Sequence, residues 1–208
     1  MNDSTLTRLL AVRHGEAIWN AEGRSHGHLD SDLTDLGKRQ AKATAFALET
    51  FRFEALYSSD LGRAKGTAEI IADHLNLKIT LEPRLRDRNL GVLQGLTIQE
   101  SISRYPEEYR NFSSGNIDYV IPGGENKRQR HERCISCGVE LVSRHVGSRI
   151  LLVVHGGVLD SFFRKSLKVP LAQQRSFPIF HTSINEFSVS NSDWKLDRFA
   201  SIDHLQGL

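Results

Sequence analysis

The sequence predicts an α/β protein, a three-layer α/β/α sandwich with a mainly parallel central sheet. Short apolar runs such as 150–154 are typical of strands that are buried on both faces. Amphipathic stretches of helical periodicity alternate with these runs, which is the pattern of a parallel sheet covered by helices. The 208 residues fit a single domain over 1–208, since a chain of this length buries roughly 70% of its extended surface.

The first strand–helix unit is expected in residues 9–50. The apolar run 9–13 leads into a polar loop, which predicts a buried strand. Thr34 is a suitable N-cap for a helix over 35–50, because its hydroxyl accepts a hydrogen bond from the first turn. The expected buried face consists of the apolar residues nearest to helical spacing, Leu36, Ala43, Phe46, Ala47 and Phe51.

Residues 55–81 repeat this alternation of strand and helix. Short strands are predicted at 55–57 and 77–81, the second stopping before Pro83 because proline has no N–H to donate to a sheet. Between them, 61–75 carries apolar residues at helical spacing, which predicts the second helix of the chain.

A cap-like segment is expected around 96–125. Thr97 and Glu100 form a T-x-x-E capping box for a short helix, which Pro106 limits. The polar, glycine-containing stretch 113–124 predicts an exposed loop. After it we expect a long helix over 125–146, a buried strand at 149–154 and a helix over 157–167. Two further strands are expected at 184–189 and 194–199, joined by a turn at 190–193.

Composition excludes several classes of protein. Lys+Arg 27 against Asp+Glu 25 gives a net charge of +2, too balanced for a general nucleic-acid coat. No apolar run approaches the ~20 residues of a membrane span, and residues 1–10 do not resemble a secretory signal. The 2 cysteines cannot form a disulfide framework and suit a reducing compartment. We therefore expect a cytoplasmic protein without nucleic-acid or membrane partners; no pattern predicts its oligomeric state.

Two predicted strands end in similar chemistry. The first runs into an RHGE motif at 13–16, and the strand 149–154 runs into HGG at 155–157. Ligands of parallel sheets bind beyond the carboxyl ends of the strands. An imidazole beside a guanidinium resists protonation and stays nucleophilic, whereas arginine binds phosphate oxygens bidentately. One His-Gly pair alone is more often structural, but two strand ends that each carry such a pair point more strongly to a functional site, for which phosphate is the ligand that the arginine suits.

These motifs resemble those of the histidine phosphatase superfamily, in its phosphoglycerate-mutase-like branch. The matching blocks are RHGE at 13–16 with Trp19 and Asn20, DSDLT at 30–34 with Gly37, YSSDL at 57–61 with Arg63, Ala64, Thr67 and Ala68, Gly91 with LQGL at 93–96, GGE at 123–125, VHGG at 154–157, and His204 with Leu205. An RHGE motif alone is a weak signal. The ordered set covers nearly the whole chain and is very specific.

The resemblance implies a role for each matched residue. His14 is the implied nucleophile, which takes the phosphoryl group as phosphohistidine. The implied phosphate-binding residues are Arg13, His14, Asn20, His26, Arg63, His155 and Gly156, of which Arg13, Arg63 and His155 stabilise the charge during transfer. Asp87 falls where the family carries the acid that protonates the leaving oxygen and then activates water. No metal or other cofactor is implied, because arginine and imidazolium donors neutralise the phosphate.

The aspartate at this position is a departure from the family, which usually carries glutamate there. Its carboxyl group lies one methylene nearer the backbone, and the neighbouring Arg86 and Arg88 favour its ionised form, which opposes general-acid action. Asp87 is alternatively only an ion-pair partner. In that case Glu16 or Glu125 supplies the proton, or leaving groups of low pKa are preferred.

The second departure is His26, where related phosphatases often carry glutamine. This histidine either donates a hydrogen bond to the phosphate or is a solvent-facing loop residue; both interpretations stay open. His28, His131 and His145 are expected at the surface.

A basic segment, Lys127–Arg130 with Arg133, begins the predicted long helix. Such a charge run usually forms a solvated face; alternatively it attracts a second anionic group of the substrate. Cys134 and Cys137 form a C-x-x-C without a second pair, so buried free thiols are expected rather than a zinc site.

The sequence therefore predicts a metal-independent phosphatase that hydrolyses small-molecule phosphomonoesters through a phosphohistidine on His14. A cofactor-dependent phosphoglycerate mutase is the nearest rival. Mutases of the family tend to have a longer segment between the acid and the second histidine, whereas Asp87 and His155 are 68 positions apart here. A non-catalytic phospholigand-binding or partner-binding scaffold is the rival from another class. No motif in 96–124 identifies the substrate.

Overall fold

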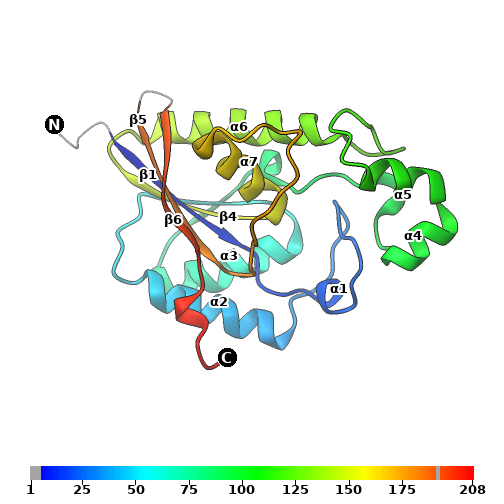
Figure 1. The fold of residues 1–208 in the computed structure, drawn as a ribbon. Helices are drawn as coiled ribbons and strands as arrows, with labels where there is room; N and C mark the ends of the chain where they lie inside the picture. Colours follow the sequence, from blue (N-terminus) through cyan, green and yellow to red (C-terminus); the bar gives the residue numbers. More distant parts are fainter. Residues whose placement is uncertain (1–5, 191–192) are drawn as a thin grey trace.

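The protein, a computed structural model that describes residues 6–190 and 193–208, contains one six-stranded sheet (Figure 1). Its strands are β1 (Thr7–Arg13), β2 (Ala55–Ser58), β3 (Ile79–Leu81), β4 (Arg149–Val154), β5 (Ile184–Ser190) and β6 (Asp193–Ser201). The order is β3-β2-β4-β1-β5-β6; the first three neighbouring pairs are parallel, and the last two are antiparallel. All predicted strands are therefore confirmed. Of the predicted turn at 190–193, residues 191 and 192 lie outside the described residues.

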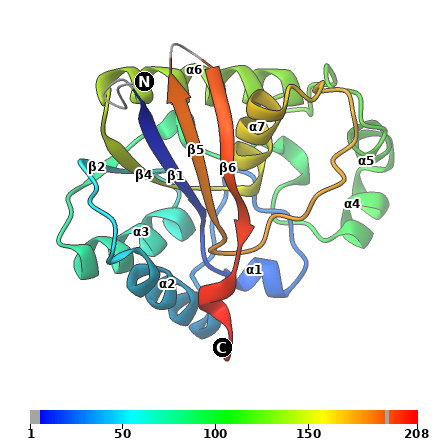
Figure 2. The same cartoon turned by 60° about the vertical axis from the view of Figure 1, so that its left-hand side comes forward.

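Helices cover both faces of this sheet (Figures 1 and 2). They are α1 (Ile18–Ala21), α2 (Asp35–Leu48), α3 (Gly62–Leu75), α4 (Ile98–Arg104), α5 (Pro106–Ser113), α6 (Lys127–Arg144) and α7 (Gly156–Leu167), with 3-10 turns at Pro83–Leu85, Gly91–Leu93 and Asp203–Leu205. Alternate side chains of β1 point to opposite faces. Leu9 and Ala11 pack in the core under α6 and α7, while Leu10 and Val12 pack under α2 and α3. The predicted three-layer sandwich is thus confirmed.

The buried face of α2 differs from the prediction. The buried residues are Gly37, Ala41, Thr44, Ala45 and Leu48, of which only Leu48 is large and apolar. Of the predicted residues, Ala47 and Phe51 are partly buried against the core, whereas Phe46 is 61% exposed. The reason is a close approach of backbones that large side chains would prevent. A Cβ at Gly37 would overlap the carbonyl oxygen of Glu16, and one at Gly15 would overlap the carbonyl oxygen of Gly37. This contact brings the N-terminal turn of α2, capped by Thr34 as predicted, against the loop that follows β1.

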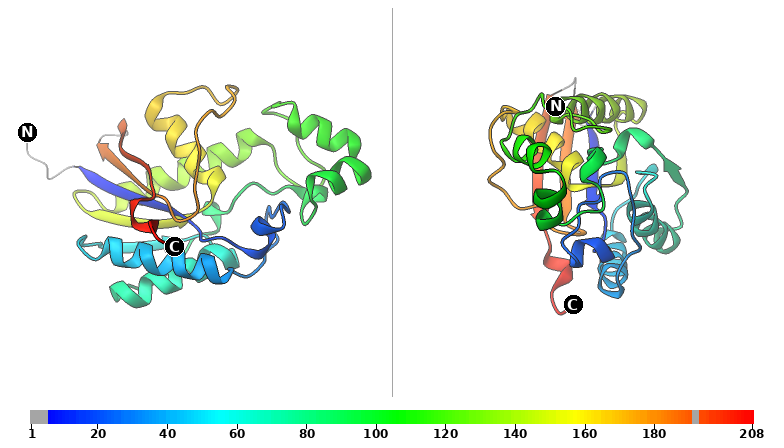
Figure 3. Two further views of the ribbon diagram at one scale, coloured as in Figure 1. Left: turned by 60° about the horizontal axis from the view of Figure 1, so that its bottom comes forward. Right: turned by 90° about the vertical axis from the view of Figure 1, so that its right-hand side faces the viewer.

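The segment between β3 and α6 lies beyond the carboxyl ends of the parallel strands, where α4 and α5 project from the rest of the chain (Figures 1 and 3). The capping box of Thr97 and Glu100 forms as predicted. Pro106 ends α4 but also begins α5, because proline is well suited to the first turn of a helix. In the predicted exposed loop, Ile121 is fully buried. No helix in the described ranges has both the length and the apolar character that crossing a membrane requires.

Candidate active site

A cavity of about 370 Å³ lies at the carboxyl ends of the parallel strands. It is lined by Arg13, His14, Asn20, Arg24, Ser25, His26, Gly27, Arg63, Asp87, Arg88, Leu90, Phe112, Lys127 and Arg130. Six of the predicted site residues are in this lining. The other two, His155 and Gly156, adjoin it, since the ring centroid of His155 is 5.2 Å from that of His14. The fold therefore brings together side chains from both histidine-bearing strand ends.

His14 is held in one tautomer by the backbone. It follows β1 directly, and its own N–H donates to the Val154 carbonyl oxygen of the neighbouring strand at 2.9 Å. Its Nδ1 lies 2.7 Å from the carbonyl oxygen of Gly15, which only accepts, so Nδ1 carries the proton and Nε2 keeps its lone pair. Burial, reinforced by His155, Arg63 and Arg13, holds the pKa of His14 well below its usual range. The ring is therefore neutral at neutral pH, the form in which an imidazole nitrogen can act as a nucleophile.

His155 lies at the start of α7, immediately after β4. Its Nε2 lies 2.8 Å from Ser59 Oγ, which also accepts from the Leu61 N–H at 3.4 Å. When Ser59 donates to Nε2, the ring proton is on Nδ1, which is buried and has no hydrogen-bond partner among the described residues. Burial and then Arg63 and Arg13 hold the pKa of His155 well below its usual range. A donor is thus available beside His14.

Arg13 and Arg63 each retain a donor for a ligand. Arg13 Nη1 donates to the carbonyl oxygen of Ile179 at 2.6 Å, and Arg63 donates to Asp30 Oδ1 at 2.8 Å and to the Gly27 carbonyl oxygen at 3.0 Å. The Nε atoms of both side chains are buried without a hydrogen-bond partner in the described part of the chain. Burial lowers the pKa of Arg13 to about 10, and Asp87 opposes that shift. Arg13 therefore stays charged at neutral pH.

His26 is buried, which contradicts the solvent-facing interpretation. It is 7% exposed, its Nε2 lies 2.9 Å from Ser31 Oγ, and its ring centroid is 6.5 Å from that of His14. Burial, followed by Arg63, lowers the pKa of His26 to about 4. Asn20 uses its side-chain oxygen to accept from the Ala17 N–H at 3.1 Å, which turns its NH₂ group toward other acceptors.

Asp87 is fixed through its backbone. Its carbonyl oxygen accepts from His28 Nε2 at 2.9 Å and from Arg133 Nη2 at 3.2 Å, and its Oδ1 accepts from the Arg88 N–H at 2.8 Å. The flanking guanidinium groups bind elsewhere: Arg86 pairs with Asp60, and Arg88 donates to the carbonyl oxygens of Glu125 and Tyr119. Among the described residues no cation forms a salt bridge with Asp87, which contradicts its interpretation as an ion-pair partner only.

Glu16 and Glu125, the alternative proton donors, bind partners outside the cavity. Glu16 accepts from the Thr34 hydroxyl at 2.8 Å, and Glu125 pairs with Arg133 at 2.6 Å. Neither lines the cavity. Of the carboxyl groups considered from the sequence, only Asp87 faces the site.

The structure also adds residues that sequence reasoning missed. His181 comes from the segment before β5, and its ring centroid is 5.7 Å from that of His14. His28, predicted at the surface, is half-buried and supports Asp87; His131 and His145 are half-buried too. No local signal distinguishes these histidines, because their surroundings are built by distant segments.

The basic segment at the start of α6 does not form one solvated face. Arg128 is exposed and pairs with Asp118, whereas Arg130 is 5% exposed and lines the cavity with Lys127. Cys134 and Cys137 are buried free thiols, as predicted, and burial raises their pKa values to about 11 and about 12. Within the described ranges, no group of three or more His, Cys, Asp or Glu side chains is arranged to hold a metal ion.

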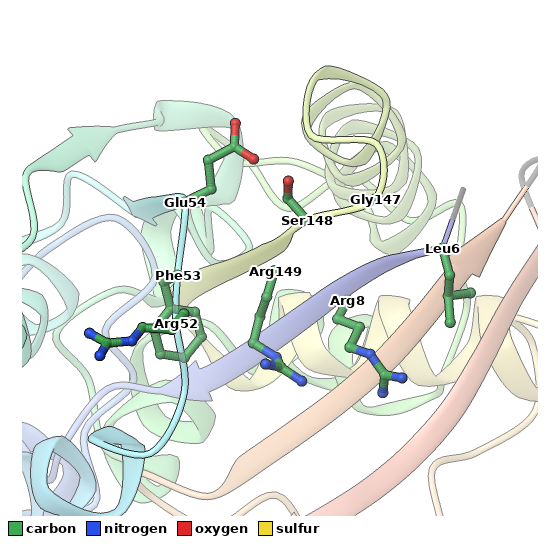
Figure 4. Close-up of a pocket in the computed structure, with 8 residues that line it drawn as sticks. All are labelled: Leu6, Arg8, Arg52, Phe53, Glu54, Gly147, Ser148 and Arg149. Carbon is green, nitrogen blue, oxygen red and sulfur yellow. The ribbon is translucent and has the colours of Figure 1, made fainter. Parts of the chain in front are cut away.

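A second cavity, of about 430 Å³, lies at the opposite end of the parallel strands (Figure 4). It is lined by Leu6, Arg8, Arg52, Phe53, Glu54, Gly147, Ser148 and Arg149. It contains arginines, Ser148 and Glu54 but no histidine. The adjacent histidines expected for phosphoryl transfer lie at the carboxyl-end cavity.

An α/β sandwich with a buried neutral histidine and two arginines at its strand ends defines a protein built to bind a phosphoryl group. Residues 9–202 match the family described as the histidine phosphatase superfamily (branch 1), and the chain belongs to this superfamily.

Three known proteins illustrate this relationship. The chain is 38% identical over 208 residues to phosphoglycerate mutase-like protein 4 of Arabidopsis thaliana, covering 98% of this chain and 89% of that protein. It is 36% identical over 209 residues to the metal-independent phosphoserine phosphatase of the same plant, covering 99% and 86% respectively. The solved structure of Bacillus stearothermophilus YhfR superposes with a TM-score of 0.91 at 31% identity, covering 96% of this chain and 100% of that one.

Proposed function

We propose that the protein is a metal-independent phosphatase that hydrolyses small-molecule phosphomonoesters through a phosphohistidine on His14. The observation that carries the proposal is the state of His14. This ring is neutral, its Nδ1 proton is bound by the Gly15 carbonyl oxygen, and Arg13, Arg63 and His155 surround it. A family that contains phosphatases and mutase-like proteins supports an enzyme with this chemistry.

The reaction proceeds in two transfers. In the first, the lone pair of His14 Nε2 attacks phosphorus, the P–N bond forms and the P–O bond to the leaving alcohol breaks. The carboxyl group of Asp87 gives its proton to the departing oxygen. Arg13, Arg63 and His155 Nδ1 donate to the phosphoryl oxygens, with further hydrogen bonds from Asn20 and His26 and from the N-terminus of α7 at Gly156.

In the second transfer, water attacks the phosphohistidine. The Asp87 carboxylate takes a proton from that water as its oxygen bonds to phosphorus and the P–N bond breaks. Inorganic phosphate leaves, and His14 returns to its neutral state. The cycle consumes one water and needs no metal, because the guanidinium groups offset the charge of the phosphate.

A phosphoglycerate mutase is the second candidate, favoured by the resemblance to phosphoglycerate mutase-like protein 4. It shares the first transfer but passes the phosphoryl group to a second substrate instead of water. Interconversion of phosphoglycerates faster than phosphate release would favour the mutase. Binding of phosphate esters without any turnover would instead favour a non-catalytic scaffold.

The test is phosphate release from 4-nitrophenyl phosphate by chelator-treated protein. Nitrophenolate leaves without protonation, so the assay measures the nucleophile separately from Asp87. We expect turnover to survive the chelator and to fall on the order of 10⁴-fold or more in His14→Ala. His74→Ala, a change on α3 outside the cavity, is the matched control and is expected to retain activity. Full activity of His14→Ala, or loss of activity on chelation, would contradict the proposal.

A further inference from the structure

The lining of the active-site cavity includes three cations that the proposed reaction does not use. They are Arg88, Lys127 and Arg130, called here the outer cation cluster. Arg13 and Arg63 already serve the phosphoryl group. Arg24, which also lines the cavity, pairs with Glu22 and Glu100 and so has its own counter-charges.

Arg130 lacks a counter-charge of its own. Its side chain is only 7% exposed, and Nη2 donates to Asp160 Oδ2 at 3.1 Å. The other oxygen of Asp160 accepts from Arg164 Nε at 3.1 Å, so one carboxylate serves two buried guanidinium groups. Arg130 Nε is buried and has no hydrogen-bond partner within the described residues. The pair of arginines therefore leaves one positive charge unbalanced beside the cavity.

The other two members of the cluster bind only neutral groups. Arg88 donates to the carbonyl oxygens of Glu125 and Tyr119, and Lys127 Nζ donates to the carbonyl oxygen of Leu171 at 2.9 Å. Burial lowers the pKa of Arg88 to about 10 and also lowers the pKa of Lys127, and neighbouring cations add to both shifts. Glu125 and Asp87 oppose the shift of Arg88, and Asp160 opposes that of Lys127. The lowered pKa values mean that these carboxylates do not fully offset desolvation and repulsion, a cost that an anionic ligand would reduce.

We infer that the substrate carries a second anionic group, a carboxylate or a second phosphate, on its alcohol part, and that the outer cation cluster binds it. This inference rests on the proposed function and names its substrate class. The cavity of about 370 Å³ suits a small molecule, with the phosphoryl group at His14 and the second anion at Arg130. Arginine binds a carboxylate or a phosphate through paired donors, which makes this contact selective as well as favourable.

The test compares three esters that differ only at one carbon. Glycerol 3-phosphate has a hydroxymethyl group there, 3-phosphoglycerate a carboxylate, and glycerol 1,3-bisphosphate a second phosphate. We expect kcat/KM for at least one of the two doubly anionic esters to exceed that for glycerol 3-phosphate by about tenfold or more. The better of the two identifies the source of the second anion. Equal values for all three would overturn the inference.

Variants locate the preference within the cavity. Arg130→Met is expected to reduce the preference about tenfold, and Asp160 keeps Arg164 as its partner in this variant. Lys127→Met is a second variant on the same helix in case the buried change prevents folding. Arg128→Met is the control, since Arg128 is exposed, pairs with Asp118 and lies outside the cavity. A preference that survives both cavity variants would overturn the inference.

Two further measurements separate this inference from the proposed function. Turnover of 4-nitrophenyl phosphate reports on the phosphohistidine chemistry alone. Calorimetric binding of the three esters reports on the outer cation cluster even without turnover. Selective binding of a doubly anionic ester without any turnover would contradict the proposed function but support the role of the outer cation cluster. Turnover of 4-nitrophenyl phosphate without selectivity for a doubly anionic ester would support the proposed function but contradict the role of the cluster.

Discussion

The two ends of the parallel sheet both carry arginines, yet only one end is suited to bind phosphate. At the carboxyl end, β4 runs directly into the N-terminus of α7, whose partial positive charge adds to that of Arg13 and Arg63. At the amino end, β4 is preceded by the C-terminus of α6, whose partial charge is negative. Arg8 and Arg149 lie there 3.8 and 3.6 Å from Glu186 and face a cavity without histidine (Figure 4). Chain direction, rather than the number of arginines, is therefore the feature from which we expect an anion to bind at the carboxyl end.

After the loss expected for His14→Ala, the largest expected difference is between two matched substitutions at opposite ends of β1. Arg13→Met is expected to lower kcat/KM for 4-nitrophenyl phosphate on the order of 10³-fold, because it removes a charged donor from the transition state. Arg8→Met removes an arginine from the same strand at the other end and is expected to change kcat/KM less than about twofold. Similar losses in both variants would break the comparison.

Asp87→Asn is expected to have the next largest effect, and only on some substrates. Alkyl phosphates need a protonated leaving group, so their turnover is expected to fall about 100-fold or more. Turnover of 4-nitrophenyl phosphate is expected to change much less, because its leaving group needs no proton. Steady-state kinetics with both substrates measure the ratio, and an unchanged ratio would remove Asp87 from the role of general acid.

The smallest expected effect is on stability, and it arises from the histidines buried at the carboxyl end. Native His14, His26 and His155 have lowered pKa values, about 4 for His26, while the unfolded chain binds these protons near pH 6.5. The unfolded state therefore binds more protons below about pH 6.5, so the free energy of unfolding falls as the pH drops from there toward 4. Thermal unfolding at a series of pH values measures the slope.

His26→Gln tests whether this slope comes from the active site. Glutamine does not titrate, so the variant is expected to lose stability less steeply than the parent protein below about pH 6.5. At higher pH the two proteins are expected to have the same pH dependence. Parallel curves throughout would show that His26 is not a source of the slope.

The helices and strands, and the histidines and arginines proposed to hold the phosphoryl group, were predictable because both depend on local sequence patterns. A strand such as β4 is buried on both faces and is therefore an unbroken apolar run, and His14 and His155 directly follow such strands. Arg63 is found by its place in an ordered motif. The cap was harder: α5 was missed because Pro106 ends one helix and begins the next.

The outer cation cluster was predictable only in part, because the spacing of residues along the sequence does not show which side chains are buried. Arg128 and Arg130 are two residues apart in one basic segment, yet the first pairs at the surface and the second is buried against α7. His181 lies far along the chain from His14 and reaches the site only through the segment that leads into β5. The buried face of α2 was predicted only in part: Ala47 and Phe51 pack against the core, but Phe46 is exposed because the backbone contact at Gly37 turns the opposite face of the helix inward.

The sequence by itself determined the family, the alternation of strands and helices, and the histidines and arginines of the proposed phosphoryl site. It did so because those properties depend on residues next to one another: periodicity, caps and motifs at strand ends. Only the tertiary structure decided which charges are paired and which are left over. Asp160, shared by Arg130 and Arg164, illustrates the reason. Electrostatic balance depends on distance and burial in space, and these are set by the packing of α6 against α7 rather than by either segment alone.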